Sequence, residues 1–224
     1  MKKMTASLMC ILLVFSMALT MSGCGNDEKK ILGTWESKVD CSEWFMKRFT
    51  EGLEAGNEGE KMAKYFQIDS FEMTLYLTFN EDGTYAMGVR EETVRTAMEG
   101  IKDDIEKGLE NYLIDELKPI FGEEIGAEDV GEFIEPLMEK AFGEETMESL
   151  MQNVQKSTTE GYYKLEDDKI CMSKDLEEEI GTDHDTYKLS GNTLTLLECF
   201  CEMDNEDAAQ WMRELYPLEF TKVD

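Results

Sequence analysis

Apolar and polar residues alternate with a period of two in several short runs of this chain. Alternation of this kind is typical of half-buried β-strands, and turn residues separate the runs. The positions that share a face in the successive runs are Ile31, Gly33, Trp35 and Ser37; Met73, Leu75, Leu77 and Phe79; Tyr85, Met87 and Val89; Tyr163 and Leu165; Ile170 and Met172; Tyr187 and Leu189; Leu194 and Leu196; and Leu218 and Phe220. We therefore predict about eight strands.

Short turns join most of these strands to their neighbours in sequence. Asn80-Glu81-Asp82-Gly83, Glu166-Asp167-Asp168 and Ser190-Gly191-Asn192 each lie between two alternating runs. Glycine in such a turn accepts the positive φ that tight hairpins require. Strands that pair with their sequence neighbours form an antiparallel meander, which closes readily into a small barrel.

A helical pattern interrupts the strands between residues 91 and 157, where apolar residues recur every three or four positions. A first helix ends at Pro119 and Gly122, and a second is kinked or restarted at Pro136. The apolar faces of the three predicted helices are Val94, Met98, Ile101, Ile105, Leu109 and Tyr112; Val130, Phe133, Ile134, Leu137, Met138 and Phe142; and Met147, Leu150, Met151 and Val154.

Two shorter segments also read as helical insertions. Residues 42–66 contain short helices broken by Gly52, Gly56 and Gly59, and Asp204 can cap a helix that ends near residue 215. Because strands on both sides of the insertions are needed to complete one sheet, we predict a single domain over residues 31–224 of the α+β class. A separate helical domain over residues 91–157 is the alternative.

The N-terminal segment has the three parts of an export signal. Lys2 and Lys3 precede an apolar run over residues 8–19, and small residues stand just before Cys24. The ending Leu19-Thr20-Met21-Ser22-Gly23-Cys24 resembles the signal of bacterial lipoproteins, which implies cleavage after residue 23 and acylation of Cys24. Residues 24–30 then form a short tether to the membrane. The alternative is an ordinary cleaved signal peptide in which Cys24 is a chance cysteine.

Three motifs on the predicted strands resemble the lipocalin-like domain of bacterial surface lipoproteins. They are Ile31-Leu32-Gly33-Thr34-Trp35-Glu36, Leu77-Thr78-Phe79-Asn80-Glu81-Asp82-Gly83-Thr84-Tyr85 and Tyr187-Lys188-Leu189-Ser190-Gly191-Asn192-Thr193-Leu194-Thr195-Leu196, with Phe220-Thr221-Lys222 as a closing strand. The resemblance covers about residues 31–40, 68–90 and 161–223. The chain lacks the Thr-Asp-Tyr motif of the better-known lipocalins, and its late basic residue is Lys222 rather than arginine.

This resemblance implies an antiparallel lipocalin-like barrel with Trp35 at one end and a mouth at the other. The residues expected to line its interior are Trp35, Leu75, Leu77, Phe79, Tyr85, Met87, Tyr163 and Tyr187. We expect a barrel that binds a small apolar or amphipathic ligand, although eight strands can also be filled by their own side chains. The alternatives are a protein-interaction module that acts through the acidic helical insertion and a purely structural lipoprotein.

Net charge narrows the choice of partner. The chain carries a formal charge of −28, and removal of residues 1–23 takes away two lysines and no acids, which leaves −30. Residues 91–157 contain nineteen acids and six bases. So strongly acidic a protein is unsuited to bind nucleic acid or anionic lipid. We expect it to be held by lipid on the extracytoplasmic face of the cell membrane, or on the outer membrane if the host has two membranes.

We find no sequence motif for catalysis or for a cofactor. No nucleophile elbow, phosphate-binding loop, dinucleotide fingerprint or zinc-protease motif occurs, so we expect a protein that is not an enzyme and holds no cofactor. The lone histidine, His184, stands between two acids in a turn and reads as solvated. A metal site built from Cys41, Cys199 and Cys201 would lack a complete ligand set. With Cys171, these cysteines allow three disulfide pairings, which the sequence leaves open.

Overall fold

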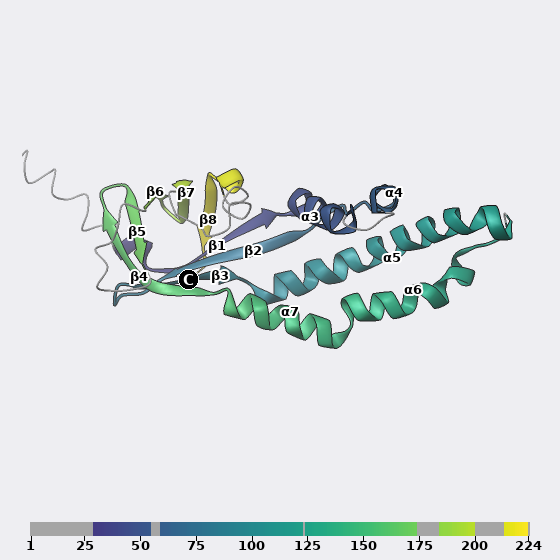
Figure 1. The fold of residues 1–224 in the computed structure, drawn as a ribbon. Helices are drawn as coiled ribbons and strands as arrows, with labels where there is room; N and C mark the ends of the chain where they lie inside the picture. The colour runs from purple at the N-terminus through teal and green to yellow at the C-terminus, as the bar shows by residue number, and fades with distance from the viewer. Residues whose placement is uncertain (1–28, 55–58, 123, 174–183, 200–212, 224) are drawn as a thin grey trace, which may run out of the picture. The chain divides into compact units, whose positions relative to one another are not determined.

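A computed structural model of the chain describes residues 29–54, 59–122, 124–173, 184–199 and 213–223. The elements follow one another as labelled in Figure 1: β1 (Gly33–Asp40), α3 (Ser42–Glu54), α4 (Gly59–Ala63), β2 (Glu72–Phe79), β3 (Thr84–Val89), α5 (Glu91–Phe121), α6 (Ala127–Phe142), α7 (Glu144–Lys156), β4 (Thr159–Glu166), β5 (Lys169–Ser173), β6 (Asp185–Ser190), β7 (Thr193–Cys199) and β8 (Leu218–Lys222). The predicted α+β class is confirmed.

The eight strands form a closed antiparallel barrel in which each strand pairs with its neighbours in sequence and β8 pairs with β1. Closure follows from the last pairing, where Trp35 lies opposite Lys222. Between β7 and β8, Leu194 lies opposite Phe220 and Leu196 lies opposite Leu218. All four of these leucine and phenylalanine side chains are buried, so the alternation read from the sequence points them to the inside of the barrel.

The three hairpin turns predicted from the sequence are present. Gly83 closes the β2–β3 turn at φ +82°, and Gly191 closes the β6–β7 turn at φ +59°. In the first turn the Asp82 carboxylate accepts hydrogen bonds from both the backbone N–H and the hydroxyl of Thr84. Asp167 takes the left-handed conformation at φ 56° in the β4–β5 turn. Aspartate tolerates this conformation better than most residues.

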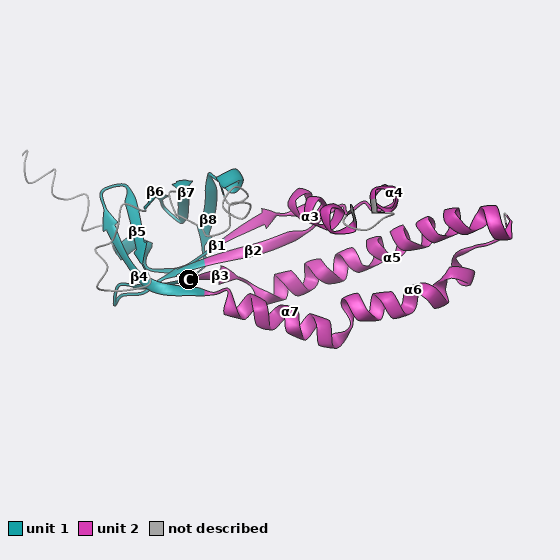
Figure 2. Ribbon diagram, viewed as in Figure 1, with its two compact units in different colours: residues 1–36, 77–86, 159–224 teal, residues 37–76, 87–158 magenta. Residues whose placement is uncertain are grey.

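The structure divides into two compact units, drawn in different colours in Figure 2. Unit 1 comprises residues 1–36, 77–86 and 159–224, and unit 2 comprises residues 37–76 and 87–158. Strands β1, β2 and β3 contribute residues to both units. The predicted single domain over residues 31–224 stays a prediction.

Within unit 2, α5 is the central helix, and both α6 and α7 pack against it. Its buried residues repeat at helical spacing over five turns: Val94, Ala97, Ile101, Ile105, Gly108 and Tyr112. On α6 the buried residues are Val130, Ile134 and Met138, and on α7 they are Met147 and Met151. These sets agree with most of the predicted apolar faces. Phe133 and Leu137 are the exceptions, because the structure leaves both exposed.

The helix breaks predicted at proline and glycine were wrong. Gly52 lies inside α3, Pro119 lies inside the last turn of α5, and α6 runs through Pro136 without interruption. Proline removes one backbone hydrogen bond, and each of the two prolines is exposed, where water can satisfy the freed carbonyl. The helix α5 ends instead at Gly122, whose φ of +96° suits glycine and whose N–H donates to the Lys118 carbonyl at 2.9 Å.

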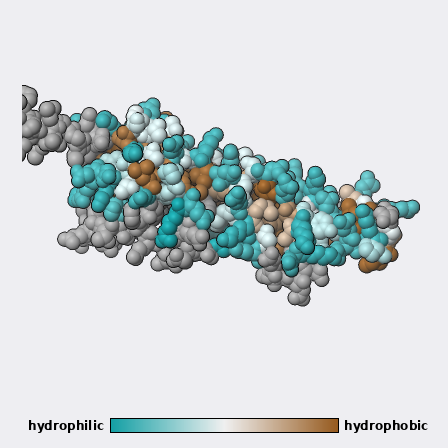
Figure 3. Space-filling view, turned by 90° about the horizontal axis from the view of Figure 1, so that it is seen from above, coloured by the Kyte–Doolittle hydropathy of each residue, from teal (hydrophilic) through white to brown (hydrophobic). Residues whose placement is uncertain are grey.

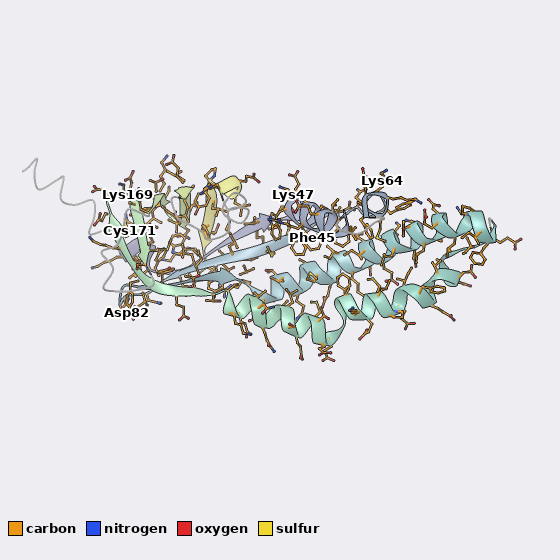
Figure 4. The ribbon with its side chains drawn as sticks, in the orientation of Figure 1. Phe45, Lys47, Lys64, Asp82, Lys169 and Cys171 are labelled. Carbon is orange, nitrogen blue, oxygen red and sulfur yellow. The ribbon has the colours of Figure 1, made fainter. Side chains whose placement is uncertain are left out.

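Aromatic side chains pack α3 and the segment after α4 into unit 2. Phe45, labelled in Figure 4 on α3, lies against Phe71 with ring centroids 4.6 Å apart. Phe49 meets Phe66 edge to face at 5.0 Å. Such pairs contribute roughly 0.5–1.5 kcal/mol beyond the area that they bury.

Three further details differ from the sequence prediction. Ile31 lies in a helical turn over residues 29–31 rather than in the first strand, although it is fully buried. On β2, Thr74 is buried while Met73 and Leu75 are only half-buried. The alternation therefore changes phase between the two ends of the strand, where residues belong to different units. Most of the predicted helix over residues 204–215 lies outside the described residues.

Two glycines of α5 provide a matched test of its packing. A Cβ at Gly108 would lie 2.5 Å from the Phe66 ring and 3.0 Å from the Tyr65 carbonyl, whereas one at Gly100 meets no atom within 4 Å. We expect Gly108→Ala to lower the free energy of unfolding by roughly 1–3 kcal/mol through overpacking. Gly100→Ala should raise it by roughly 0.5–1 kcal/mol because alanine favours the helix. Urea unfolding measures both changes, and equal effects would contradict the packing of α5 on Phe66.

Candidate interaction surface

The residues expected to line the barrel divide into a buried and a half-buried group. Trp35, Leu77, Phe79, Tyr85 and Tyr187 are buried. Leu75, Met87 and Tyr163 are half-buried. A side chain with no exposed surface touches neither solvent nor a water-sized void, and this holds for Trp35 and Leu77. At these positions the barrel is filled by its own side chains.

Trp35 is the centre of the packing between β1 and β8. Its side chain is fully buried, and its Nε1–H donates to the Ile31 carbonyl oxygen at 2.6 Å. Lys222, opposite it on β8, places its Nζ 5.2 Å from the Trp35 ring centroid and donates to the Lys30 carbonyl oxygen at 3.1 Å. A lysine over a tryptophan face is a favourable cation–π contact. The predicted anchor role of Trp35 and the late basic residue Lys222 thus meet in one cluster.

Aromatic contacts fill the region beside the β2–β3 turn in the same way. Phe79 meets Tyr163 edge to face with ring centroids 4.7 Å apart. The Tyr163 hydroxyl donates to the Asn80 carbonyl oxygen at 3.2 Å. Burial raises the pKa of the Tyr85 hydroxyl. These three aromatic residues act as core, which is what an eight-stranded barrel needs to fill itself.

The sequence analysis missed one polar pair in unit 1. Asp185 is only 4% exposed, and the Tyr216 hydroxyl donates to its Oδ2 at 3.3 Å. Burial raises the pKa of Tyr216, and the nearby Asp185 charge raises it further. The signal was present in the alternation, because Asp185 and Tyr187 lie two residues apart on β6 and both are buried. The neighbouring His184 is half-buried.

A cleft of about 480 Å³ lies within unit 2 beside the first half of α5. Its lining residues are Lys38, Asp69, Ser70, Glu72, Met73, Thr74, Glu92, Thr93, Thr96, Ala97, Gly100 and Asp104. Asp69 and Asp104 also line a second hollow of about 290 Å³. Four carboxylates and one lysine make the larger cleft acidic. None of the residues predicted to line a ligand site in the barrel lines it.

Four large apolar side chains of unit 2 are exposed near the turn between α5 and α6. Ile120 and Phe121 end α5 and are 72% and 70% exposed, while Phe133 and Leu137 on α6 are 66% and 52% exposed. We call these four residues the hairpin patch. Hydrophobic surface is visible at this end of the α5–α6 hairpin in Figure 3. Exposed apolar residues that gather at one place are characteristic of interaction sites.

The exposure of Phe133 and Leu137 follows from the width of the apolar stripe on α6. At 100° per residue, the stripe spans about 140° from Phe133 through Leu137, Val130 and Ile134 to Met138. The half of this arc that carries Val130, Ile134 and Met138 is buried, and the half that carries Phe133 and Leu137 is exposed. The sequence analysis assigned the whole arc to the core and so missed this surface. An apolar arc wider than one helix contact was the available signal.

The described cysteines are buried free thiols. Burial, together with the neighbouring Asp40 charge, raises the pKa of Cys41 to about 11, and burial raises the pKa of Cys171, which is labelled on β5 in Figure 4. Protonated buried thiols are poor nucleophiles and poor metal ligands. Within the part of the chain that the structure describes, no cluster of histidine, cysteine and acidic residues is arranged to hold a metal ion. Cys24, Cys201 and the side chain of Cys199 lie outside the described residues.

No family model, curated protein or solved structure matches this chain. Of the helices described, none has the length and apolar character needed to cross a bilayer.

Proposed function

We propose that this protein is a lipid-anchored extracytoplasmic lipoprotein whose helical unit binds another protein. Cys24 carries the lipid, a filled lipocalin-like barrel is the scaffold, and unit 2 carries the binding surface. The observation behind this proposal is the hairpin patch, whose four side chains are more than half exposed. Burial of such side chains against a partner removes apolar surface from water at roughly 25 cal/mol per Å².

The filled barrel positions support an interaction protein over a carrier. Trp35 and Leu77 have no exposed surface, and Phe79 is 1% exposed. A ligand cavity lined by these residues would have to open by moving close-packed side chains, which interiors resist. The described structure therefore offers more to a partner on unit 2 than to a small molecule among these residues.

A small amphipathic ligand held in the barrel is the second candidate function. The Asp185–Tyr216 pair favours it, because ligand pockets combine apolar walls with a few polar groups. In this alternative the pair would bind the polar end of the ligand. The two candidates differ in where a ligand or partner contacts the chain.

Site-specific photo-crosslinking in the native host tests the proposal. A photoreactive residue at position 137 is expected to form a discrete protein adduct in the membrane fraction, and one at position 223 is not. Val223 is the matched control, because it is 52% exposed like Leu137 but belongs to unit 1. Cys24→Ser should release the chain from that fraction. Equal adducts at both positions, or none, would contradict the binding role of the patch.

A further inference from the structure

The hairpin patch is surrounded by carboxylates without basic partners. From Ile120 to Glu139 the chain has seven acids and no lysine or arginine. Among the described residues, six of these acids are exposed and none forms an ion pair: Glu124, Glu128, Asp129, Glu132, Glu135 and Glu139. By contrast, Asp115 and Glu116, just before the patch on α5, pair with Lys118 and Lys61. Negative charge around the patch is therefore not neutralised within unit 2.

This charge excludes two of the usual occupants of an exposed apolar surface. A second copy of the chain would bring an identical set of carboxylates against the first, and like charges across an interface cost several kcal/mol. An anionic bilayer would repel the same carboxylates. A partner that matches both features must carry apolar side chains flanked by positive charge.

The anchors have the spacing of a helix-binding site. Phe133 and Leu137 are four residues apart on α6, so they lie one above the other on its surface, about 6 Å apart along the axis. Ile120 and Phe121 extend the apolar surface at the end of α5. An amphipathic helix presents its own stripe at i, i+3, i+4 and i+7, which matches anchors spaced in this way.

We propose that the hairpin patch binds a basic amphipathic helix of another protein. Its apolar stripe packs on Phe133 and Leu137, and its lysine and arginine side chains pair with the carboxylates around the patch. This inference rests on the proposed function, since it names the chemistry of the partner at the same surface. Electrostatic complementarity at such a surface accelerates association and sets specificity, while the apolar anchors supply affinity.

Titration of labelled model peptides into the purified mature chain tests this proposal by fluorescence anisotropy. The probe is an amphipathic helical peptide of lysine and leucine. A glutamate–leucine peptide with the same stripe tests charge, and a scrambled lysine–leucine peptide tests the stripe. We expect the lysine–leucine peptide to bind at least tenfold more tightly than either, with an affinity that falls as salt rises.

Variants of the chain assign the binding to the patch. Phe133→Ala with Leu137→Ala should weaken binding of the lysine–leucine peptide about tenfold, while Val223→Ala leaves it unchanged. Glu124→Gln, Glu128→Gln and Glu132→Gln together should weaken it about fivefold and flatten the salt dependence. Glu144→Gln, Glu145→Gln and Glu148→Gln on α7 are the matched charge control, because these acids are also exposed and open a helix.

Each outcome bears on one of the two proposals. Binding of the glutamate–leucine peptide that depends on Phe133 and Leu137 would overturn the basic partner and keep the patch as a binding surface. Equal binding of the scrambled peptide would reduce the contact to charge alone and overturn the helix. Patch-dependent binding to neutral phosphatidylcholine vesicles, with no peptide binding, would assign the patch to a membrane surface. No binding by any probe, with no crosslink from position 137, would overturn both proposals.

Discussion

Trp35→Ala is expected to lower the free energy of unfolding by about 3–5 kcal/mol, the range for truncation of a large buried aromatic side chain. Trp35 is fully buried between β1 and β8, so its removal leaves a cavity in the strand pair that closes the barrel. The variant also loses the hydrogen bond from Nε1 to the Ile31 carbonyl oxygen, a buried acceptor. Urea unfolding followed by far-ultraviolet circular dichroism measures the change.

Lys222→Met provides the control for the cation over the Trp35 ring. Methionine keeps most of the apolar stem and removes the charge, so we expect a loss of about 0.5–1 kcal/mol. The difference between the two variants separates cavity formation from the cation–π contact. A loss below about 1 kcal/mol for Trp35→Ala would show that the barrel does not depend on this anchor.

Ile134→Ala and Leu137→Ala are expected to act in opposite ways, although the two residues lie three apart on α6. Ile134 is 1% exposed, so its truncation should cost about 2–5 kcal/mol of stability. Leu137 is 52% exposed, and its truncation should change stability by less than about 1 kcal/mol. Partner binding should respond in the reverse order, with about a tenfold loss for Leu137→Ala.

The two measurements are urea unfolding and crosslinking from a photoreactive residue at position 133. Ile134→Ala must be tested for binding under conditions where it remains folded. If Leu137→Ala cost as much stability as Ile134→Ala, Leu137 would belong to the core and the hairpin patch would not be a free surface. If both variants crosslinked as well as the parent chain, the patch would not be the binding surface.

Local chemistry accounts for how much of the barrel the sequence predicts. Gly83 and Gly191 mark turns that only certain residues can form, and the alternation beside them assigns each side chain to a face. Because the strands pair with their neighbours in sequence, the turns alone determine most of the topology. Trp35 and its opposite number Lys222 follow from the same register.

The helical unit is less predictable because burial there depends on distant contacts. Pro136 was expected to break a helix, but its exposed position lets water replace the lost hydrogen bond. Phe133 and Ile134 have similar hydrophobicity, and only the placement of α5 decides which of them is covered. A pattern of spacing defines the apolar arc of α6 and cannot define how much of the arc a neighbour covers.

Native mass spectrometry of the mature chain, purified gently from its own host beside its Phe133→Ala, Leu137→Ala variant, tests the central claim most directly. We predict a parent chain without a small-molecule adduct and a fraction of it in complex with a second, basic protein, with the complex lost in the variant. A small molecule released on denaturation from both chains, with no protein complex in either, would contradict the account and establish the barrel as a carrier.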